Sequence, residues 1–158
     1  MTDKSADAEH AKERLFKTID HDRYGMLGVT GGEPRHLQPM TAFHDEGEGT
    51  LWFFTKKDTD LAQDVGQGRT AMFCVMAKDR ELQACVAGQL SPSQDRERIQ
   101  KYWGPMVSAW FPEGKDDPNL CLLRFDMADA RIWLSDQNPI KFYWEMVRAN
   151  VTDTPPDI

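Results

Sequence analysis

The sequence predicts a mainly β (α+β) protein, built as a small antiparallel barrel of six or seven strands with peripheral helices. After about residue 20 the chain changes to short runs rich in β-branched and aromatic residues, separated by Gly, Pro, Asp and Asn. Several connections between these runs are short enough for hairpins, which makes neighbouring strands antiparallel. Residues 51–54 and 71–76 are continuously apolar, as is typical of strands covered on both faces.

The chain has 158 residues and a formal net charge of −7, and its 40% hydrophobic and 28% charged residues are ordinary for one globular domain. We therefore expect a single domain over residues 1–158. No stretch reaches the roughly 18 apolar residues of a membrane helix, and the N-terminus lacks the apolar segment of a signal peptide. We expect a cytoplasmic protein with no membrane partner. The negative charge, without a basic and aromatic cluster, also argues against a nucleic-acid partner.

The cysteines are Cys74, Cys85 and Cys121, and no two of them form a CxxC pair. This odd number and spacing suggest neither a disulfide framework nor a thiolate zinc site. We expect all three to be reduced residues of the core.

The first expected element is an N-terminal helix over residues 1–20, because Ala8, Ala11, Leu15 and Ile19 recur at helical spacing. The expected strands cover residues 24–30, 36–43, 50–55, 70–76, 81–90, 119–126 and 130–134. A short helix is expected over residues 58–65, where Gly66 and Gly68 follow.

Two more helices are expected in the second half of the chain. Ser91 can cap a helix that has Pro92 at its first position and Gln94 reaching back to the cap. Asn138 and Pro139 are expected to start a C-terminal helix over residues 138–150, followed by a flexible tail over residues 151–158.

Common catalytic motifs are missing from the sequence. No serine lies in a GxSxG turn, and the glycines of residues 25–32 do not follow the GxGxxG order, so neither a hydrolase nor a Rossmann site is expected. His36 and His44 would share a strand face only if one unbroken strand ran through both. We favour a sheet histidine and a turn histidine over a metal site. We expect no catalytic side chain and no metal ligand.

A more informative group of residues lies at two strand ends. Thr55 ends the third expected strand and Thr59 starts the following helix, where hydroxyls, free N–H groups and the helix dipole favour a phosphate. Lys56 and Lys57 add a basic pair. Pro39 lies inside the second expected strand and removes a ladder donor, which indicates an edge. One interpretation is a site for a flat aromatic ligand, and the other is a Pro-bulged strand followed by a capped helix.

The order of the motifs resembles a known family. From about Arg14 to Trp133 the chain contains PMTA, LWFFT, DTDL, DRERIQKYW, AWFPEGKDDPNL and ARIW, in this order. This order resembles the general stress protein branch of the pyridoxamine 5′-phosphate oxidase-like FMN-binding split barrels. The segment AWFPEGKDDPNL around Trp110 is the most specific part. The resemblance implies a split barrel and a homodimer that holds FMN in each of two clefts between its subunits.

By position, the resemblance implies that one strand lines the flavin ring and that the end of another strand holds the phosphate. It matches Gln83 to a glutamine that reaches the flavin from the other subunit, and Trp133 to an aromatic position near the ring. The residues that we expect to bind the cofactor are His36, Gln38, Pro39, Met40, Thr41, Phe54, Thr55, Lys57, Thr59, Asp60, Leu61, Gln83, Trp110 and Trp133.

The phosphate end departs from the family pattern. Gln38 stands where the oxidases place an arginine, and Asp60 and Leu61 stand where they carry Arg-Lys. Either another cation takes over, or hydroxyls and backbone groups hold FMN weakly. The candidate cations are Arg35, His36, Lys56, Lys57 and Arg69.

The expected function is FMN binding in stress or redox metabolism, with flavin-dependent oxidoreduction of an unknown substrate. A non-catalytic flavin store or sensor is the alternative, and a deazaflavin or haem in the same barrel is a further one. Oxidation of pyridoxamine 5′-phosphate itself is not expected, because the Arg-x-His signature of those oxidases is missing from the C-terminal segment.

Overall fold

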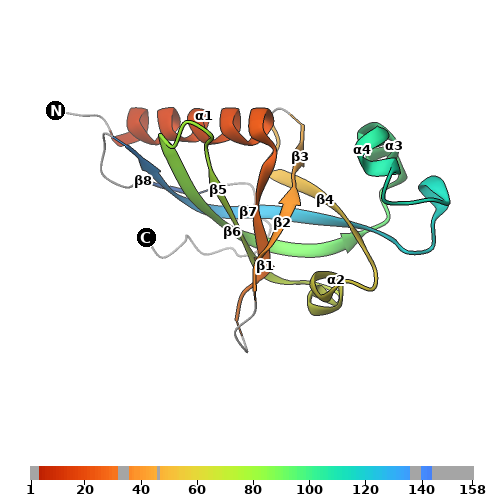
Figure 1. Cartoon of the computed structure of the whole chain (residues 1–158). Coiled ribbons are helices and arrows are strands. Elements are labelled where there is room, and N and C mark those ends of the chain that lie inside the picture. The colour runs from red at the N-terminus through yellow and green to blue at the C-terminus, as the bar shows by residue number, and fades with distance from the viewer. Residues whose placement is uncertain (1–3, 32–35, 46, 136–139, 144–158) are drawn as a thin grey trace.

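The computed structural model describes residues 4–31, 36–45, 47–135 and 140–143, which form one antiparallel sheet with helices around it (Figure 1). The helices are α1 (Lys4–Asp22), α2 (Asp60–Val65), α3 (Arg96–Tyr102) and α4 (Pro105–Ser108), with a 3-10 turn η1 (Gly114–Asp116). The strands are β1 (Tyr24–Val29), β2 (Gln38–Thr41), β3 (Phe43–His44), β4 (Thr50–Lys56), β5 (Arg69–Met76), β6 (Leu82–Ser93), β7 (Leu120–Leu134) and β8 (Ile140–Tyr143).

The strands pair in the order β2-β1-β5-β6-β7-β4-β3, and β8 adds to β7. All of these pairs are antiparallel. One part of β7 pairs with β4 and a later part pairs with β8, and the sheet curls beneath α1 (Figure 1). The predicted antiparallel split barrel with peripheral helices is confirmed. β2 is an edge strand, as Pro39 predicts.

A bulge bends β6 against β7. The register shifts between Ala87 and Gly88, which face Asp129 and Met127, so Ala128 is an extra residue on β7. A Cβ atom on Gly88 would lie 2.2 Å from the carbonyl oxygen of Asp126, so this close approach requires glycine. Because β7 continues through the bulge, the separate strands expected over residues 119–126 and 130–134 are one strand.

The expected strand over residues 36–43 is divided, since β2 ends at Thr41 and β3 begins at Phe43. The helix expected from Ser91 also begins later than predicted. Residues 91–93 continue β6 opposite residues 122–124 of β7, and that pairing outweighs the local capping signal. Asp95 caps α3 instead, because its carboxylate accepts a hydrogen bond from the N–H of Arg98 at 3.1 Å.

Residues 140–143 form β8, where a helix over residues 138–150 is predicted. They pair with residues 129–132 of β7, which lie past the part of β7 that β4 covers. Pairing along a free edge of the sheet therefore overrides the helical spacing of the apolar residues. The remainder of 138–150 and the tail over 151–158 lie outside the described residues.

Helices α1 and α2 form where they are predicted, although α1 continues to Asp22 and α2 begins at Asp60 rather than at residue 58. Ala11, Leu15 and Ile19 of α1 are buried in the core, with at most 1% of their surface exposed. Thr59 caps α2, and its C-cap is Gly66, which has a positive φ of 56°.

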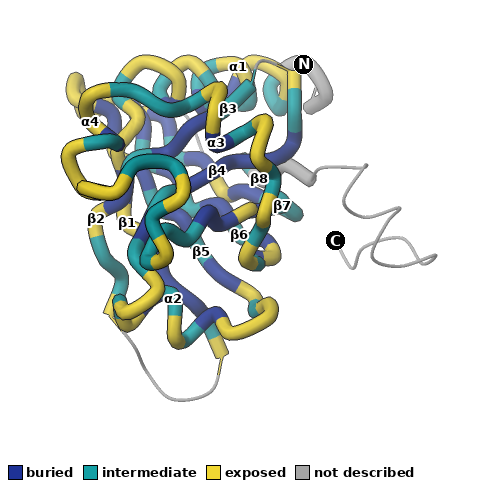
Figure 2. Tube along the Cα trace, turned by 90° about the vertical axis from the view of Figure 1, so that its right-hand side faces the viewer, coloured by how far each residue is buried: buried dark blue, intermediate teal, exposed yellow. Residues whose placement is uncertain are grey.

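Two hydrophobic cores lie on the two sides of β4, and Figure 2 shows buried residues following the strands. Leu51 and Phe53 belong to the main core, whereas Trp52 packs in a second core with Ile99 of α3 and Phe111. Residues 51–54 are therefore covered on both faces, as predicted.

β5 differs from this prediction. Phe73 and Val75 are buried, whereas Cys74 is half-buried and Met76 is 62% exposed. Residues 71–76 are thus covered on one face within the protomer. The three cysteines are free, as expected, but all of them are half-buried rather than core residues.

Candidate functional site

A cavity of about 360 Å³ lies between β2, the end of β4 and α4. Its volume is within the range of small-molecule sites, roughly 300–1,000 Å³. The cavity brings together these predicted cofactor-binding residues: Gln38, Pro39, Met40, Thr41, Phe54, Thr55, Thr59 and Trp110. Residues that are far apart in sequence therefore converge on one site, which we call the β2 cavity.

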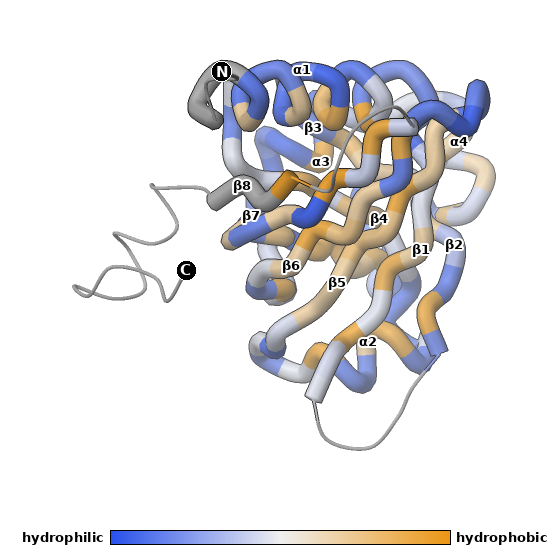
Figure 3. The backbone as a smooth tube through the Cα atoms, turned by 90° about the vertical axis from the view of Figure 1, so that its left-hand side faces the viewer, coloured by the Kyte–Doolittle hydropathy of each residue, from blue (hydrophilic) through white to orange (hydrophobic). Residues whose placement is uncertain are grey.

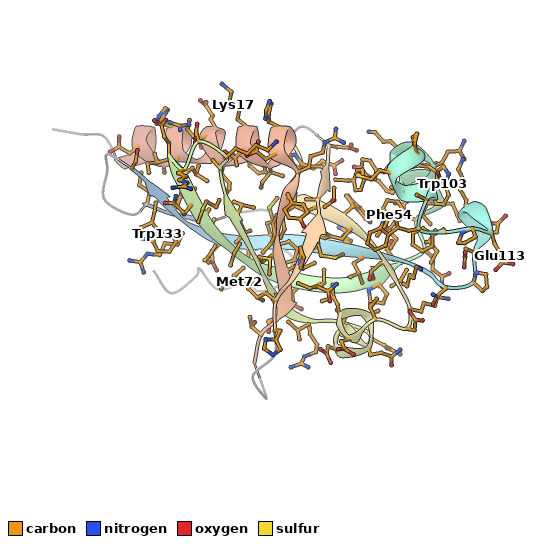
Figure 4. The ribbon with its side chains drawn as sticks, viewed as in Figure 1. Lys17, Phe54, Met72, Trp103, Glu113 and Trp133 are labelled. Atoms are coloured by element: carbon orange, nitrogen blue, oxygen red, sulfur yellow. The ribbon has the colours of Figure 1, made fainter. Side chains whose placement is uncertain are left out.

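Aromatic side chains form much of the wall of the β2 cavity. The rings of Phe43 and Phe54 meet edge to face with centroids 5.5 Å apart, and Trp103 packs on Phe54 at 6.4 Å (Figure 4). At the rim, Tyr24 and Trp110 are 60% and 63% exposed. A flat apolar ligand would bury these exposed rings.

Hydroxyl groups mark the α2 end of the cavity. Thr55 is buried, with 4% of its surface exposed, and its hydroxyl oxygen lies 3.0 Å from that of Thr59. Thr59 also donates to the carbonyl oxygen of Lys56 at 2.8 Å and accepts from the N–H of Ala62 at 3.2 Å. Thr59 is therefore both a lining residue and the cap of α2.

Among the candidate cations, Lys56 lines the β2 cavity. Lys57 is exposed and does not line it. Arg69 is directed elsewhere, since its guanidinium donates to the carbonyl oxygen of Gly31 at 3.0 Å. Arg35 lies outside the described residues. Lys56 is thus the lysine placed to meet an anionic group.

A second cavity, of about 370 Å³, adjoins the first at Gln38, which lines both. The predicted residues His36, Asp60 and Leu61 line this second cavity and not the β2 cavity. The predicted site is therefore spread over two neighbouring cavities, and Asp60 and Lys56 line different ones.

The predicted residues Gln83 and Trp133 lie away from both cavities. They face each other across β6 and β7, and Met76 continues the same row on β5. The Gln83 amide donates to the carbonyl oxygen of Arg80 at 3.0 Å, and the Arg131 guanidinium lies over the Trp133 ring at 5.4 Å. A single chain does not bring these two residues to the β2 cavity.

The prediction did not name some residues that line the β2 cavity: Tyr24, Phe43, Met106, Val107 and Phe111. The spacing of Met106 and Trp110 resembles one face of a helix, and that signal could have added Met106 to the site. Tyr24 reaches the cavity because it pairs with Thr41, which is a matter of strand register.

A third cavity, of about 240 Å³, lies between α1, β3 and α3. Next to it, the Asp45 carboxylate accepts a hydrogen bond from the Tyr102 hydroxyl and pairs with the Lys101 ammonium, both at 2.8 Å. Burial raises the pKa of Asp45, but Lys101, Tyr102 and Arg98 lower it to a net value below its usual range. Burial, together with the hydrogen bond to Asp45, raises the pKa of Tyr102 to about 12.

The two histidines weighed as metal ligands do not converge. His44 lines the third cavity and His36 the second. The ring nitrogens of His44 lie 2.9 Å from an Asp20 carboxylate oxygen and 2.7 Å from the carbonyl oxygen of Glu48. Within the described part of the chain, no three His, Cys, Asp or Glu side chains are grouped as a metal site would require.

The curled antiparallel sheet has the strand arrangement of a split barrel, with an aromatic-walled cavity at its edge. The chain belongs to the family described as pyridoxamine 5′-phosphate oxidase like, whose model matches residues 10–157. It is 31% identical over 126 residues to General stress protein 26 of Bacillus subtilis (strain 168), covering 77% of this chain and 86% of that protein.

Solved structures agree with this assignment. The general stress FMN/FAD binding protein from Xanthomonas citri has a TM-score of 0.74 and 39% identity, over 82% of this chain and 92% of that chain. A general stress protein 26 from Jannaschia sp. CCS1 has a TM-score of 0.71 and 34% identity, over 96% of this chain and 94% of that chain. None of the helices in the described ranges is both long and apolar enough to span a bilayer.

Proposed function

We propose that the β2 cavity binds FMN and that the protein is a flavin-dependent oxidoreductase. The observation that carries this proposal is the convergence of residues 38–41 of β2 with Phe54, Thr55 and Thr59 in one cavity. The Xanthomonas citri relative, which is named as an FMN/FAD binding protein, supports the choice of a flavin.

The lining residues suit the two ends of FMN. The isoalloxazine ring would lie along β2, against the aromatic wall that includes Phe54. The ribityl and phosphate groups would lie near Thr55, Thr59 and Lys56, where hydroxyls and an ammonium group are available. Bound FMN supplies two-electron redox chemistry, while this chain binds it, orients it and excludes water from one side of the ring.

A homodimer completes the proposal. Apolar side chains remain on the face of β1, β5 and β7 that is turned away from the main core, and Figure 3 shows apolar residues along β1 and β5. Among them, Met26 and Met76 are 39% and 62% exposed. Tyr24, on the same strand face as Met26, lines the β2 cavity, so this face is continuous with the cavity.

A second copy that covers this face would close the β2 cavity. Gln83 and Trp133 lie on the same face, and Figure 4 shows Trp133 pointing away from α1. In a dimer, Gln83 of the partner subunit and Trp133 of the partner subunit would reach the cofactor, which explains why one chain leaves them outside its own cavity. We expect the dimer to act in the cytoplasm.

The test of this proposal is a titration of the apo-protein with FMN, with riboflavin and with haem. We expect saturable binding of FMN, one per protomer, and bleaching of the bound flavin by a reduced nicotinamide cofactor as well as by dithionite. Bleaching by dithionite alone would favour the alternative, a flavin store or sensor. Binding of haem in place of FMN, or of neither, would contradict the proposal. Sedimentation of a stable folded monomer at micromolar concentration would contradict the dimer.

A further inference from the structure

Cys74 of β5 and Cys85 of β6 are directly opposite each other in the antiparallel register. Their sulfur atoms lie 3.4 Å apart, and both residues are half-buried. Neither residue lines any of the three cavities described above. The pair is thus a contact of two thiols that the flavin site does not use.

The backbone at this position suits a disulfide. Opposed residues in antiparallel strands have Cα atoms about 4.5 or 5.5 Å apart, and both distances fall within the range of roughly 4.4–6.8 Å seen in disulfides. The two side chains already point to one face, because the sulfur atoms are in contact. Closing the bond to about 2.05 Å therefore needs side-chain rotation and no change of strand register.

The hydrogen bond gives the two sulfurs different roles. The Cys74 thiol donates to the sulfur of Cys85. Burial and the neighbouring Cys85 raise the pKa of Cys74 to about 12, so Cys74 keeps its proton at neutral pH. Because the Cys74 thiol is the donor in this contact, we assign the attack to the sulfur of Cys85 and the resolving step to Cys74.

We propose that Cys74 and Cys85 form a reversible redox site, which small hydroperoxides oxidise to an intramolecular disulfide. The sulfur of Cys85 attacks the peroxide O–O bond, takes one oxygen as a sulfenic acid and releases the other as water or an alcohol. The sulfur of Cys74 then displaces water from Cys85 as it loses its proton. The two sulfurs together lose two electrons, and the O–O bond accepts them.

The site belongs to the sheet face that we assign to the dimer. Met26 and Arg131 continue the same cross-strand row as the cysteines, and the neighbouring row contains Gln83. A second copy on this face would shield the thiols, so we expect oxidation to be faster at protein concentrations that favour separate protomers. The disulfide itself does not depend on the flavin or on the dimer.

The test is to treat the purified full chain with hydrogen peroxide, alkylate the remaining thiols and map the peptides by mass spectrometry. We expect loss of the thiols of Cys74 and Cys85, one peptide pair that joins them, and recovery of both thiols with dithiothreitol. Cys121, which faces Thr55 rather than another sulfur, is the internal reference and should still be alkylated. The Cys121→Ser variant should behave like the natural chain, while Cys74→Ser should form no disulfide within the chain.

Several outcomes would overturn the proposal. One is a chain that keeps all three thiols under conditions that oxidise a free thiol. Another is sulfinic or sulfonic acid at Cys85 without the joined peptide, and a third is a disulfide that includes Cys121. If sedimentation shows that the chain dissociates at the low concentration, equal oxidation rates at the low and high concentrations would support the disulfide and contradict the dimer face, so the two proposals fail separately.

Discussion

The hydroxyl oxygens of Thr55 and Thr59 lie 3.0 Å apart, and this contact joins the end of β4 to the N-cap of α2. The single proton of the Thr59 hydroxyl goes to the carbonyl oxygen of Lys56, so Thr55 is the donor within the pair. A phosphate that accepts a hydrogen bond from Thr55 must therefore replace the contact with Thr59.

This relationship separates the effects of two substitutions. Thr55→Val should weaken FMN binding by about 1 kcal/mol, roughly fivefold, because a hydroxyl donor is lost while the shape is kept. Thr59→Val should also destabilise the fold by about 1 kcal/mol, since it removes the cap of α2. Titration with FMN and urea unfolding measure the two effects. Thr55→Ser should bind FMN as tightly as the natural chain does. If Thr55→Val also binds FMN as tightly, Thr55 does not contact the phosphate.

Lys56 and Lys57 provide a matched pair for the phosphate end. Lys56 lines the cavity and Lys57 does not, so Lys56→Met should reduce the preference for FMN over riboflavin, and Lys57→Met should leave it nearly unchanged. The preference should also fall as salt rises, because a contact near the surface is partly screened. Titrations at low and high salt measure it. Equal affinity for FMN and riboflavin at every salt concentration would show that the cavity has no phosphate site.

Arg23 and Arg80 are the non-glycine residues with positive φ in the described ranges, at 62° and 64°. The N–H of Arg23 bonds to the carbonyl oxygen of Ile19 at 2.9 Å, so Arg23 ends α1 in the left-handed conformation that usually takes glycine. Arg80→Gly should stabilise the protein by about 0.5–1 kcal/mol through relief of backbone strain. Arg23→Gly should stabilise it less, because the Arg23 guanidinium lies 6.0 Å from the centroid of the Phe43 ring. Urea unfolding measures the free energy of unfolding of both variants. An equal increase in the two would show that the contact of Arg23 with Phe43 contributes nothing to stability.

Tyr102 should make the free energy of unfolding depend on pH in the alkaline range. Its pKa in the folded protein is about 12, above the ordinary value of 10.0, so the folded chain keeps the proton that the unfolded chain loses. The free energy of unfolding should therefore fall as pH rises from about 10 to about 12. Tyr102→Phe should show a shallower fall, measured by urea unfolding across that range, and identical slopes would contradict this assignment.

At the acid end, the lowered pKa of Asp45 should contribute stability above about pH 3.8 that is lost as pH falls further.

Local patterns in the sequence predict most of the sheet because they reflect which faces of a strand are covered. Residues 51–54 are apolar throughout and are covered on both faces within the protomer, whereas residues 71–76 have the same composition and are covered on one. The sequence cannot distinguish these two cases, since in the dimer that we propose the missing cover of β5 comes from the second chain. Ser91 gives a good capping signal, but pairing with β7 displaces the helix start to Asp95.

The candidate site shows a similar division. Thr55, Thr59 and residues 38–41 are predictable because strand ends and an edge proline have local signatures. Tyr24 and Phe43 enter the site through strand register and ring packing, which depend on long-range contacts. Gln83 and Trp133 lie together on the sheet but away from the cavity, so their role rests on the proposed dimer.

The central claim is that two copies of the chain share each flavin site, and mixing two defective variants tests it most directly. Lys56→Glu should damage the β2 cavity, and a Gln83→Ala/Trp133→Ala double variant should damage the face offered to a partner. After random exchange at equal amounts, half of the dimers contain one chain of each variant. In each mixed dimer, one cleft combines the undamaged cavity of one chain with the undamaged face of the other. About one quarter of all clefts should therefore bind FMN. We predict that each variant alone remains folded and binds FMN poorly, and that mixing restores FMN binding to about one quarter of the clefts. No recovery on mixing would show that the flavin site is not shared between chains.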